Sequence, residues 1–336
     1  MSKLRLLFDR FTLILIAVVT AASVVPAYGQ GAVFFEWLTT AAIALLFFLH
    51  GAKLSREAII AGATHWRLHG VVFIWTFVIF PILGWLLRPV LLPMLGEPLY
   101  VGVIYLCVLP GTVQSAIAFT SIARGNVPAA VCAASASSIV GIVITPLLLQ
   151  FMLSADTQAL GGSSLWNAIL KISVQILLPF VVGHLMRPVI GGWMDRHRKL
   201  VVAVDQSSIL LVVYTAFSES VISGLWQTVP VDALFKLVLV CCVLLAVVLV
   251  LNTWSTRRLG FNREDEITIV FCGSKKSMAT GVPMAQVLFS AAAIGPVLLP
   301  LMIFHQIQLM VCAVLAQHYQ RTAPGSPPLR QRAVQS

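Results

Sequence analysis

Two adjacent lysines interrupt an otherwise apolar run and are the residues best suited to binding a charged ligand. Lys275 and Lys276 lie between the uncharged segments 267–272 and 278–279. The charged residues 263–266 come about ten positions earlier, which is roughly 15 Å of helix and half the thickness of a bilayer's hydrocarbon core. A lysine at that depth costs several kcal/mol, so a functional reason for keeping the pair is expected.

Two arrangements of the lysine pair are open. Adjacent residues on a helix point about 100° apart, so we expect at least one of Lys275 and Lys276 to face a central cavity. A buried ammonium group needs a counter-charge, which an anionic ligand or an acid such as Glu219 could supply. The alternative is that the helix begins later and both side chains extend to water.

A second interruption lies in the first half of the chain, at Pro110-Gly111. Proline removes a helical hydrogen bond and glycine permits non-helical angles, so the sequence predicts unwound backbone there, with a simple proline kink as the alternative. The pattern Gly-[Ser/Thr]-x-[Gln/Lys]-Ser occurs at 111–115 and again at 273–277. Unwound backbone inside a membrane needs polar partners or a water-filled cavity, which makes both breaks candidate binding sites. The candidate binding residues are Thr76, Thr112, Gln114, Ser115, Glu219, Ser274, Lys275, Lys276, Ser277 and His305, with Pro110, Gly111 and Gly273 at the helix breaks.

The elements that must position these residues are long apolar segments. The chain of 336 residues is 59% hydrophobic and only 10% charged, whereas a soluble domain carries about 25% charged residues. Its apolar runs are continuous rather than alternating, which favours helices over a β-barrel. We therefore predict an all-α membrane protein, with the lipid bilayer as a partner. The ten predicted transmembrane helices cover residues 10–27, 34–51, 68–88, 99–122, 127–153, 167–187, 203–222, 233–256, 266–289 and 293–317.

The basic residues predict how these helices are oriented. Seventeen of the 22 lysines and arginines fall in the termini and loops on one side of the ten-helix arrangement, and two fall on the other. By the positive-inside rule both termini are then cytoplasmic in a bacterial inner membrane, so the net charge of +10 does not indicate nucleic-acid binding. Five helices per half imply inverted repeats over 1–153 and 154–321, followed by a disordered cytoplasmic tail at 322–336.

The function expected from these features is secondary transport of a small organic anion. The sequence has no recognisable catalytic motif, and its six cysteines lie in apolar runs without metal-ligand spacing, so we predict neither an enzyme nor a bound cofactor. The alternative is a non-transporting membrane regulator or receptor with the same fold. The oligomeric state does not follow from the sequence.

The segments 109–138 and 271–285 resemble the bile acid:sodium symporter superfamily, and in particular its bacterial SBF-like branch of sodium-dependent transporters. The step Arg124-Gly125-Asn126-Val127 adds to the resemblance, which covers nearly the whole chain. It implies a core domain, in which broken helices 4 and 9 cross, and a panel domain of helices 1, 2, 6 and 7. The substrate would bind between the domains, with sodium as the coupling ion.

The residues that carry the sodium sites in that family are only partly present here. The resemblance places a serine ligand on Ser115 and a glutamine ligand on Thr76, and both side chains can still offer oxygen to sodium. It places the acidic ligand on Phe271 and another glutamine ligand on Lys275, so a carboxylate is lost and an ammonium group is gained. A lysine could therefore replace sodium as a fixed positive charge.

Overall fold

The computed structural model of the chain describes residues 10–53, 65–153, 167, 170, 173–222, 224, 227 and 229–322. Within these residues every secondary-structure element is an α-helix or a π-helix, as the all-α prediction requires. The tail predicted to be disordered, 322–336, lies outside the described residues except for Thr322. The predicted boundary between the repeats, at 153–154, also lies outside them except for Leu153. In the first half the helices are α2 (Arg10–Val24), α3 (Gly29–Lys53), α5 (Trp66–Ile74), the π-helix η1 (Trp75–Ile79), α6 (Phe80–Leu86), α7 (Arg88–Leu95), α8 (Glu97–Val108), α9 (Gln114–Ile122) and α10 (Val127–Leu153). In the second half they are η2 (Ser173–Leu177), α12 (Leu178–Arg196), α13 (Arg198–Ile222), α15 (Val231–Arg258), α16 (Arg263–Gly273), α17 (Met278–Leu288) and α18 (Ala291–Arg321).

In the part of the chain that the structure describes, seven helical segments are long and apolar enough to cross a membrane, so the chain is a multi-pass membrane protein. They are Gly29–Lys53, Trp66–Leu86, Val127–Leu153, Ser173–Arg196, Lys199–Ile222, Val231–Arg258 and Ala293–Arg321, with shorter apolar helices at Leu13–Val24 and Glu97–Val108. Two of the predicted spans, 99–122 and 266–289, are each divided into two short helices, because the chain is not helical at 109–113 and 274–277. The count of ten spans stays a prediction.

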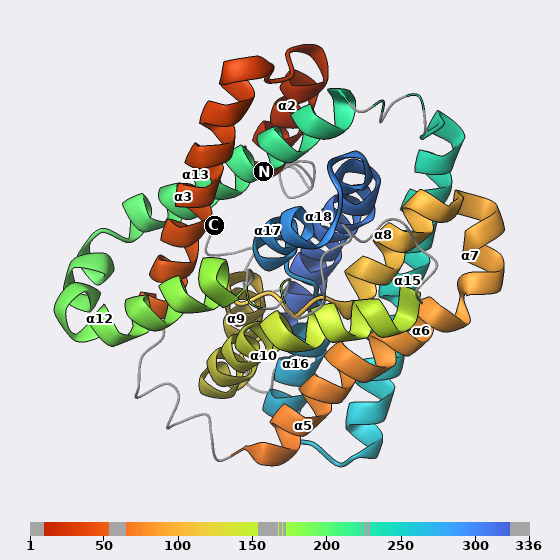
Figure 1. Cartoon of the computed structure of the whole chain (residues 1–336). Coiled ribbons are helices and arrows are strands. Elements are labelled where there is room, and N and C mark those ends of the chain that lie inside the picture. The colour runs from red at the N-terminus through yellow and green to blue at the C-terminus, as the bar shows by residue number, and fades with distance from the viewer. Residues whose placement is uncertain are drawn as a thin grey trace, which may run out of the picture.

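The helices pack as two groups (Figure 1). A peripheral group consists of α2, α3, η2, α12 and α13, in which α3 packs against both α12 and α13. A central group consists of α5 to α10 with η1, and α15 to α18, in which α18 packs against α8, α15 and α17. Helix α13 also contacts α17 and α18, so it forms part of the boundary between the two groups.

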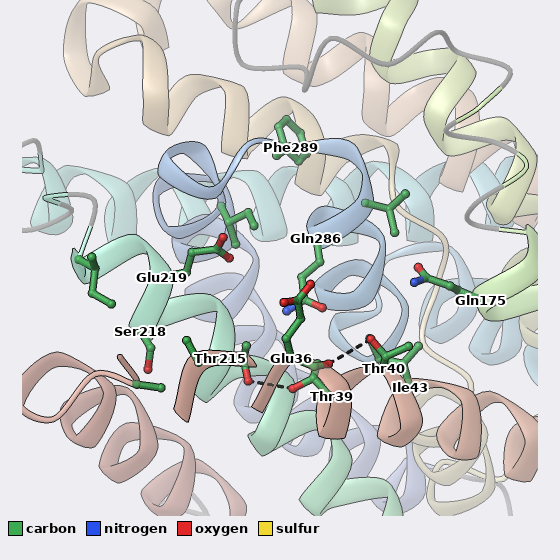
Figure 2. Close-up of a pocket in the computed structure, with 15 residues that line it drawn as sticks. Glu36, Thr39, Thr40, Ile43, Gln175, Thr215, Ser218, Glu219, Gln286 and Phe289 are labelled. Carbon is green, nitrogen blue, oxygen red and sulfur yellow. Dashed lines mark hydrogen bonds between the residues drawn. The ribbon is translucent and has the colours of Figure 1, made fainter. Parts of the chain in front are cut away.

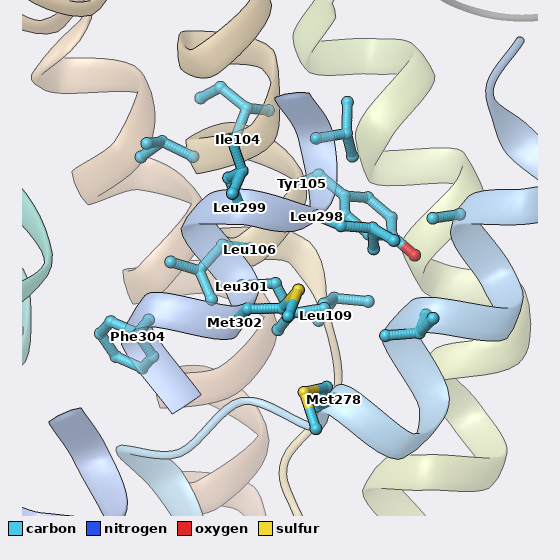
Figure 3. Close-up of a cluster of buried hydrophobic side chains, with 14 of the residues drawn as sticks. Ile104, Tyr105, Leu106, Leu109, Met278, Leu298, Leu299, Leu301, Met302 and Phe304 are labelled. Carbon is cyan, nitrogen blue, oxygen red and sulfur yellow. The ribbon is translucent and has the colours of Figure 1, made fainter. Parts of the chain in front are cut away.

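Side chains of α8, α17 and α18 form part of the apolar interior of the central group (Figure 3). Gly102 of α8 allows that helix to approach α18 closely, because a Cβ atom there would lie 2.8 Å from the Pro296 carbonyl oxygen. The hydroxyl of the buried Tyr105 donates a hydrogen bond of 2.6 Å to the Gly281 carbonyl oxygen in α17. This bond satisfies a polar group that would otherwise be buried at a cost of about 1–3 kcal/mol.

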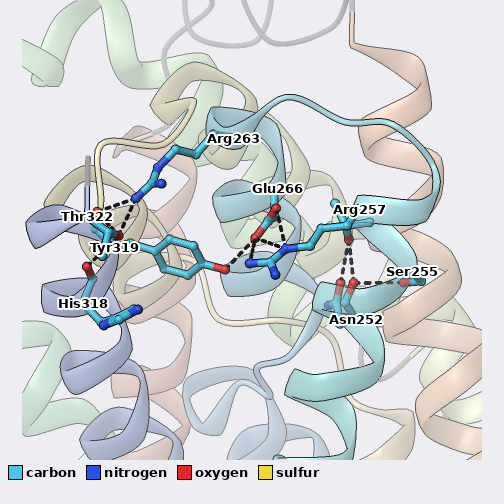
Figure 4. A network of polar contacts seen from close by, with 9 residues as sticks. Asn252, Ser255, Arg257, Arg263, Glu266, His318, Tyr319 and Thr322 are labelled. Carbon is cyan, nitrogen blue, oxygen red and sulfur yellow. Dashed lines mark hydrogen bonds and ion pairs between the residues drawn. The ribbon is translucent and has the colours of Figure 1, made fainter. Parts of the chain in front are cut away.

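A polar network fixes the start of α16, which leads into the second break (Figure 4). The Arg257 guanidinium donates to the Glu266 carboxylate over 3.0–3.1 Å, and the Tyr319 hydroxyl donates to the same carboxylate over 2.9 Å. The helix is capped by Asn262, whose side chain accepts from the Asp265 backbone N–H. These contacts tie α16 to the ends of α15 and α18.

Two glycines permit the tight contact between α3 and α12. A Cβ atom on Gly51 would overlap the Phe180 carbonyl group, and one on Gly183 would overlap the Phe48 carbonyl group. Small residues allow this close approach of backbones in membrane helices, where dispersion contacts drive association. The glycines therefore hold the peripheral group together.

We predict that Gly183→Ala lowers stability by about 1–3 kcal/mol, because the added methyl group must push α12 away from α3. The matched control is Gly192→Ala in the same helix, where a Cβ atom meets nothing within 4 Å. Thermal unfolding of both variants in detergent provides the measurement. Equal unfolding temperatures for the two variants would contradict the packing described here.

Candidate functional site

The two helix breaks lie directly against each other. The Ser277 backbone N–H, in the second break, donates a hydrogen bond of 2.9 Å to the Pro110 carbonyl oxygen in the first. A Cβ atom on Gly111 would lie 3.0 Å from the Cys272 carbonyl oxygen, so the first break needs a glycine where the segments meet. The Gly111 N–H donates to the Ser137 hydroxyl at 3.2 Å. The unwound chain is thus anchored to α10 and to the opposite break.

Unwinding at residues 109–113 deprives the end of α8 of helical hydrogen-bond donors, and each freed carbonyl must find another partner. The Thr145 hydroxyl donates to the Val108 carbonyl oxygen at 2.9 Å. The ammonium group of Lys276 donates to the carbonyl oxygens of Cys107 and Leu109, at 2.7 and 2.8 Å. The lysine therefore caps the C-terminal end of α8, where a cation is favoured.

The third oxygen around Lys276 comes from η1. In this π-helix the Phe80 N–H bonds to the Trp75 carbonyl oxygen, so the i+5 donor for the next carbonyl, that of Thr76, would be residue 81. Residue 81 is a proline and has no N–H, which leaves the Thr76 carbonyl free. It accepts a hydrogen bond of 2.9 Å from the Lys276 ammonium group, which also lies 4.2 Å from the centre of the Phe80 ring. All three donor positions of this ammonium group are thus used.

Helix α18 satisfies the backbone of Lys276. The Gln308 side-chain amide accepts from the Lys276 N–H and donates to the Lys276 carbonyl oxygen, each at 2.9 Å. The amide nitrogen also lies 2.9 Å from Nδ1 of His305, one of the predicted site residues. Gln308 therefore pairs with the unwound residue much as a neighbouring strand would, and the sequence alone gave no reason to prefer it over other polar residues.

Lys275 has a different environment. Its ammonium group donates to the Ser115 carbonyl oxygen at 2.9 Å and lies 3.9 Å from the Phe119 ring centre and 5.2 Å from that of Phe271. Cation–π attraction contributes here because the site is shielded from water. No carboxylate among the described residues forms an ion pair with Lys275 or Lys276.

The expectation that a lysine faces a central cavity is wrong for this structure. Lys275 and Lys276 both have 0% exposure, and neither lines the cavity of about 370 Å³ that lies between the helix groups. The physical reason is the break itself: residues 274–277 are not helical, so the 100° rule does not apply, and the freed carbonyls attract the ammonium groups inward. Ser274 is buried as well, and its hydroxyl donates to the Val270 carbonyl oxygen at 2.5 Å.

A cavity of about 370 Å³ lies between the two helix groups, and we call it the Asp205 cavity. Five predicted site residues line it: Thr112, Gln114, Ser115, Ser277 and His305. The peripheral group contributes Phe47, His50, Lys53, Phe180, Asp205, Gln206 and Ile209. Lys53 and His50 were absent from the predicted site, since the sequence places them at the end of a span like many other basic residues.

Asp205 is the most constrained polar residue of this cavity. Its Oδ2 atom accepts hydrogen bonds from the ammonium group of Lys53 and from the side-chain amide of Gln114, the latter at 2.6 Å. The Nε2 atom of His50 lies 3.9 Å from the same oxygen. Its other oxygen, Oδ1, is buried without a hydrogen-bond partner. The carboxylate thus connects the peripheral group to the first residue of α9.

Glu219 lies elsewhere, in a second cavity of about 350 Å³ that we call the Glu219 cavity (Figure 2). Glu36, Gln175 and Gln286 also line it, beside the hydrogen-bonded pair Thr39 and Thr215. This cavity lies at the start of α3 and the end of α13, opposite the Asp205 cavity. The structure therefore does not bring Glu219 together with the two lysines.

The predicted sodium candidates have other partners. The Thr76 hydroxyl donates to the Val72 carbonyl oxygen at 2.8 Å, and the Ser115 hydroxyl lies 2.7 Å from that of Thr112. Phe271 is fully buried at the position where the resemblance implies an acidic ligand. Sodium prefers oxygen donors, but the free carbonyl oxygens here already surround an ammonium group. The donor set around Lys276 therefore does not fit a sodium ion.

Two adjoining helix breaks in a multi-pass membrane protein, next to a cavity between two helix groups, define a class of protein: they are the arrangement typical of secondary transporters. Comparison with known proteins agrees with this class. The model of the SBF-like CPA transporter family matches residues 9–321, and the chain belongs to that family of transporters.

Several relatives cover almost the whole chain. A Pseudomonas aeruginosa protein named "Uncharacterized protein PA2026" is 62% identical over 321 residues, 96% of each chain. "Putative symporter YfeH" of Escherichia coli (strain K12) is 60% identical over 322 residues, 95% of each chain. "Sodium/bile acid cotransporter 7-B" of Xenopus laevis is 29% identical over 321 residues, 93% of this chain and 91% of its own. The resemblance to the bile acid:sodium symporter superfamily is thereby confirmed.

We predict that Lys276→Met destabilises the protein by about 2 kcal/mol or more, because three buried carbonyls lose their donor. Lys275→Met is the matched control, being equally buried. It should cost less than about 1 kcal/mol, since it removes one hydrogen bond together with a poorly solvated charge. Thermal unfolding of the two variants ranks them, and a larger loss for Lys275→Met would overturn the assignment of Lys276 as the structural cap.

Proposed function

We propose that this chain is a secondary transporter of a small organic anion in the bacterial inner membrane. Its ten spans would form two inverted five-helix repeats, at 1–153 and 154–321, with both termini cytoplasmic. Transport would proceed by movement of the peripheral group, acting as the panel, against the central group, acting as the core. The observation that carries the proposal is the convergence of two half-helix N-termini on the Asp205 cavity, beside two buried ammonium groups that form no ion pair with any described carboxylate.

The half-helices make the cavity attractive to an anion. Helices α9 and α17 both begin at the breaks, and residues 112–115 and 277–280 line the Asp205 cavity. Backbone N–H groups at a helix N-terminus carry partial positive charge and bind carboxylates and phosphates. Lys275 adds to this charge through its contact with the Ser115 carbonyl, directly behind the cavity wall.

The balance of formal charges points the same way. Among the described residues that line the cavity, Asp205 is the one carboxylate, and Lys53 already pairs with it. The buried positive charges of Lys275 and Lys276 are not neutralised by any described carboxylate. Because the surroundings have a low dielectric constant, these charges are felt in the cavity more strongly than they would be in water.

The two cavities support alternating access. The Asp205 cavity lies at the end of α3 and the start of α13, and the Glu219 cavity at their opposite ends. Buried side chains of α3 and α13, such as Leu46 and Val212, lie between them along these helices. A shift of α3 and α13 relative to the central group would open one cavity while closing the other.

We further propose that the ammonium group of Lys276 takes the place of a coupling sodium ion. It is a permanent part of the chain and lies among three carbonyl oxygens, 2.7–2.9 Å away. A relative is named as a symporter and others as sodium/bile acid cotransporters, which suggests an amphipathic carboxylate such as cholate as the first substrate to test.

The test is uptake of radiolabelled cholate into liposomes containing the purified protein. We expect rates in sodium and choline buffers to agree within about twofold, because a fixed ammonium group occupies the oxygen atoms. Protein-free liposomes are the control. Uptake that requires sodium would contradict the replacement of sodium by lysine, and absence of uptake in both buffers would contradict the proposed transport of such anions.

We also predict that Gly111→Leu reduces uptake by at least about tenfold while the protein still inserts and folds. The side chain would press on the Cys272 and Lys275 carbonyl groups and separate the crossed breaks. Gly70→Leu is the control, because a Cβ atom there meets nothing within 4 Å. Size-exclusion profiles establish folding, and normal uptake by Gly111→Leu would place the transport site elsewhere.

A further inference from the structure

We infer that Lys53 and Gln114 are the donors that hold the substrate's acidic group, and that Asp205 occupies them until the substrate displaces it. This inference rests on the proposed function; Gln114 is one of the predicted site residues, whereas Lys53 and Asp205 are not. The ligand would be a small monocarboxylate with an apolar body. Its binding would break a hydrogen bond between the peripheral and central helix groups.

The two donors, Lys53 and Gln114, differ in exposure from the acceptor, Asp205. The Lys53 side chain is 32% exposed and Gln114 is also exposed, whereas the Asp205 side chain is only 3% exposed. A solute in the cavity can therefore reach both donors, while the carboxylate approaches them from within the protein. A dissolved carboxylate can replace Asp205 on both donors and would gain charge-assisted hydrogen bonds.

One oxygen of the Asp205 carboxylate is left without a hydrogen bond. Both donors bind to Oδ2, and the buried Oδ1 has no hydrogen-bond partner. A buried acceptor without a donor costs free energy that a well-bound carboxylate avoids. The Nε2 atom of His50 in α3 lies 3.9 Å from Oδ2, close enough to donate to the carboxylate after a small movement, and His305 of α18 faces the same cavity. Asp205 therefore has His50 as an alternative partner when the substrate takes Lys53 and Gln114, so the exchange does not leave a buried carboxylate unpaired.

The three residues come from different helix groups, so replacing Asp205 by a substrate carboxylate changes a contact between the groups. Lys53 and Asp205 belong to α3 and α13 of the peripheral group, and Gln114 is the first residue of α9 in the central group. The Gln114–Asp205 hydrogen bond therefore connects the two groups. When a substrate carboxylate takes over Gln114 and Lys53, this hydrogen bond is lost and movement of one group against the other becomes easier.

The remaining wall of the cavity defines the rest of the ligand. Apolar side chains from both groups line it: Phe47, Ile139, Ile142, Phe180, Ile209 and Met278. A cavity of about 370 Å³ with one cluster of donors and an apolar wall suits a single acidic group on a hydrophobic body.

The test is equilibrium binding of radiolabelled cholate to the full-length protein in nanodiscs. Asp205→Asn should bind at least about tenfold more tightly than wild type, because the competing charge is gone while the donors remain. Lys53→Met should bind at least about tenfold more weakly, and the double variant should resemble Lys53→Met. The matched control is Asp232→Asn, which alters an exposed aspartate that pairs with Lys236 at 2.9 Å outside the cavity.

A ligand-free measurement completes the test. In a background lacking Cys132 and Cys242, the cysteine of Ile139→Cys should react faster with a thiol reagent when Asp205→Asn is added, since the helix groups separate more readily. Weaker or unchanged cholate binding by Asp205→Asn, or an unchanged thiol rate, would overturn this inference and leave the proposed function standing. Failure of wild type and Asp205→Asn alike to bind or transport cholate would instead contradict the proposed function.

Discussion

The structure depends on one requirement: carbonyl oxygens freed by irregular helical backbone inside a membrane must find donors. Lys276 meets it for three of them, on η1 and at the end of α8. A backbone carbonyl in hydrocarbon cannot turn to water, so an unwound segment is stable only with such internal partners. The buried ammonium group needs acceptors and the freed carbonyls need donors, so each satisfies the other. The lysine and the broken helix therefore require one another.

This arrangement separates the roles of the two adjacent lysines. Lys276 holds η1, α8 and the second break together, and Gln308 fixes its backbone. Lys275 contacts the Ser115 carbonyl and two aromatic rings, and so places its charge just behind the wall of the Asp205 cavity. One ammonium group therefore serves mainly the architecture, while the other contributes mainly to the electrostatic potential where a ligand would bind.

The chain shares its fold family with sodium/bile acid cotransporters, yet the place where its two helix breaks meet is chemically different from what that resemblance implies. A hydrophobic ring stands at the acidic position, and tethered cations lie among the available oxygens. A tethered cation cannot dissociate, so a site of this kind can stabilise the crossing but cannot by itself draw energy from an ion gradient. This physical difference is the basis for proposing that sodium plays no part in coupling.

The sequence by itself determined the helical membrane class, most helix positions and the sites of unwinding. The span predicted at 127–153 coincides with α10, and those at 203–222 and 233–256 lie within α13 and α15, because apolar runs and flanking charges are local signals. Proline and glycine likewise mark the first break locally. Tertiary structure alone decided where the lysines point and that Lys53, Gln114 and Asp205 meet. The oxygen partners of Lys276 lie 167 to 200 positions away along the chain, and unwinding removes the helical periodicity from which a side chain's direction is predicted.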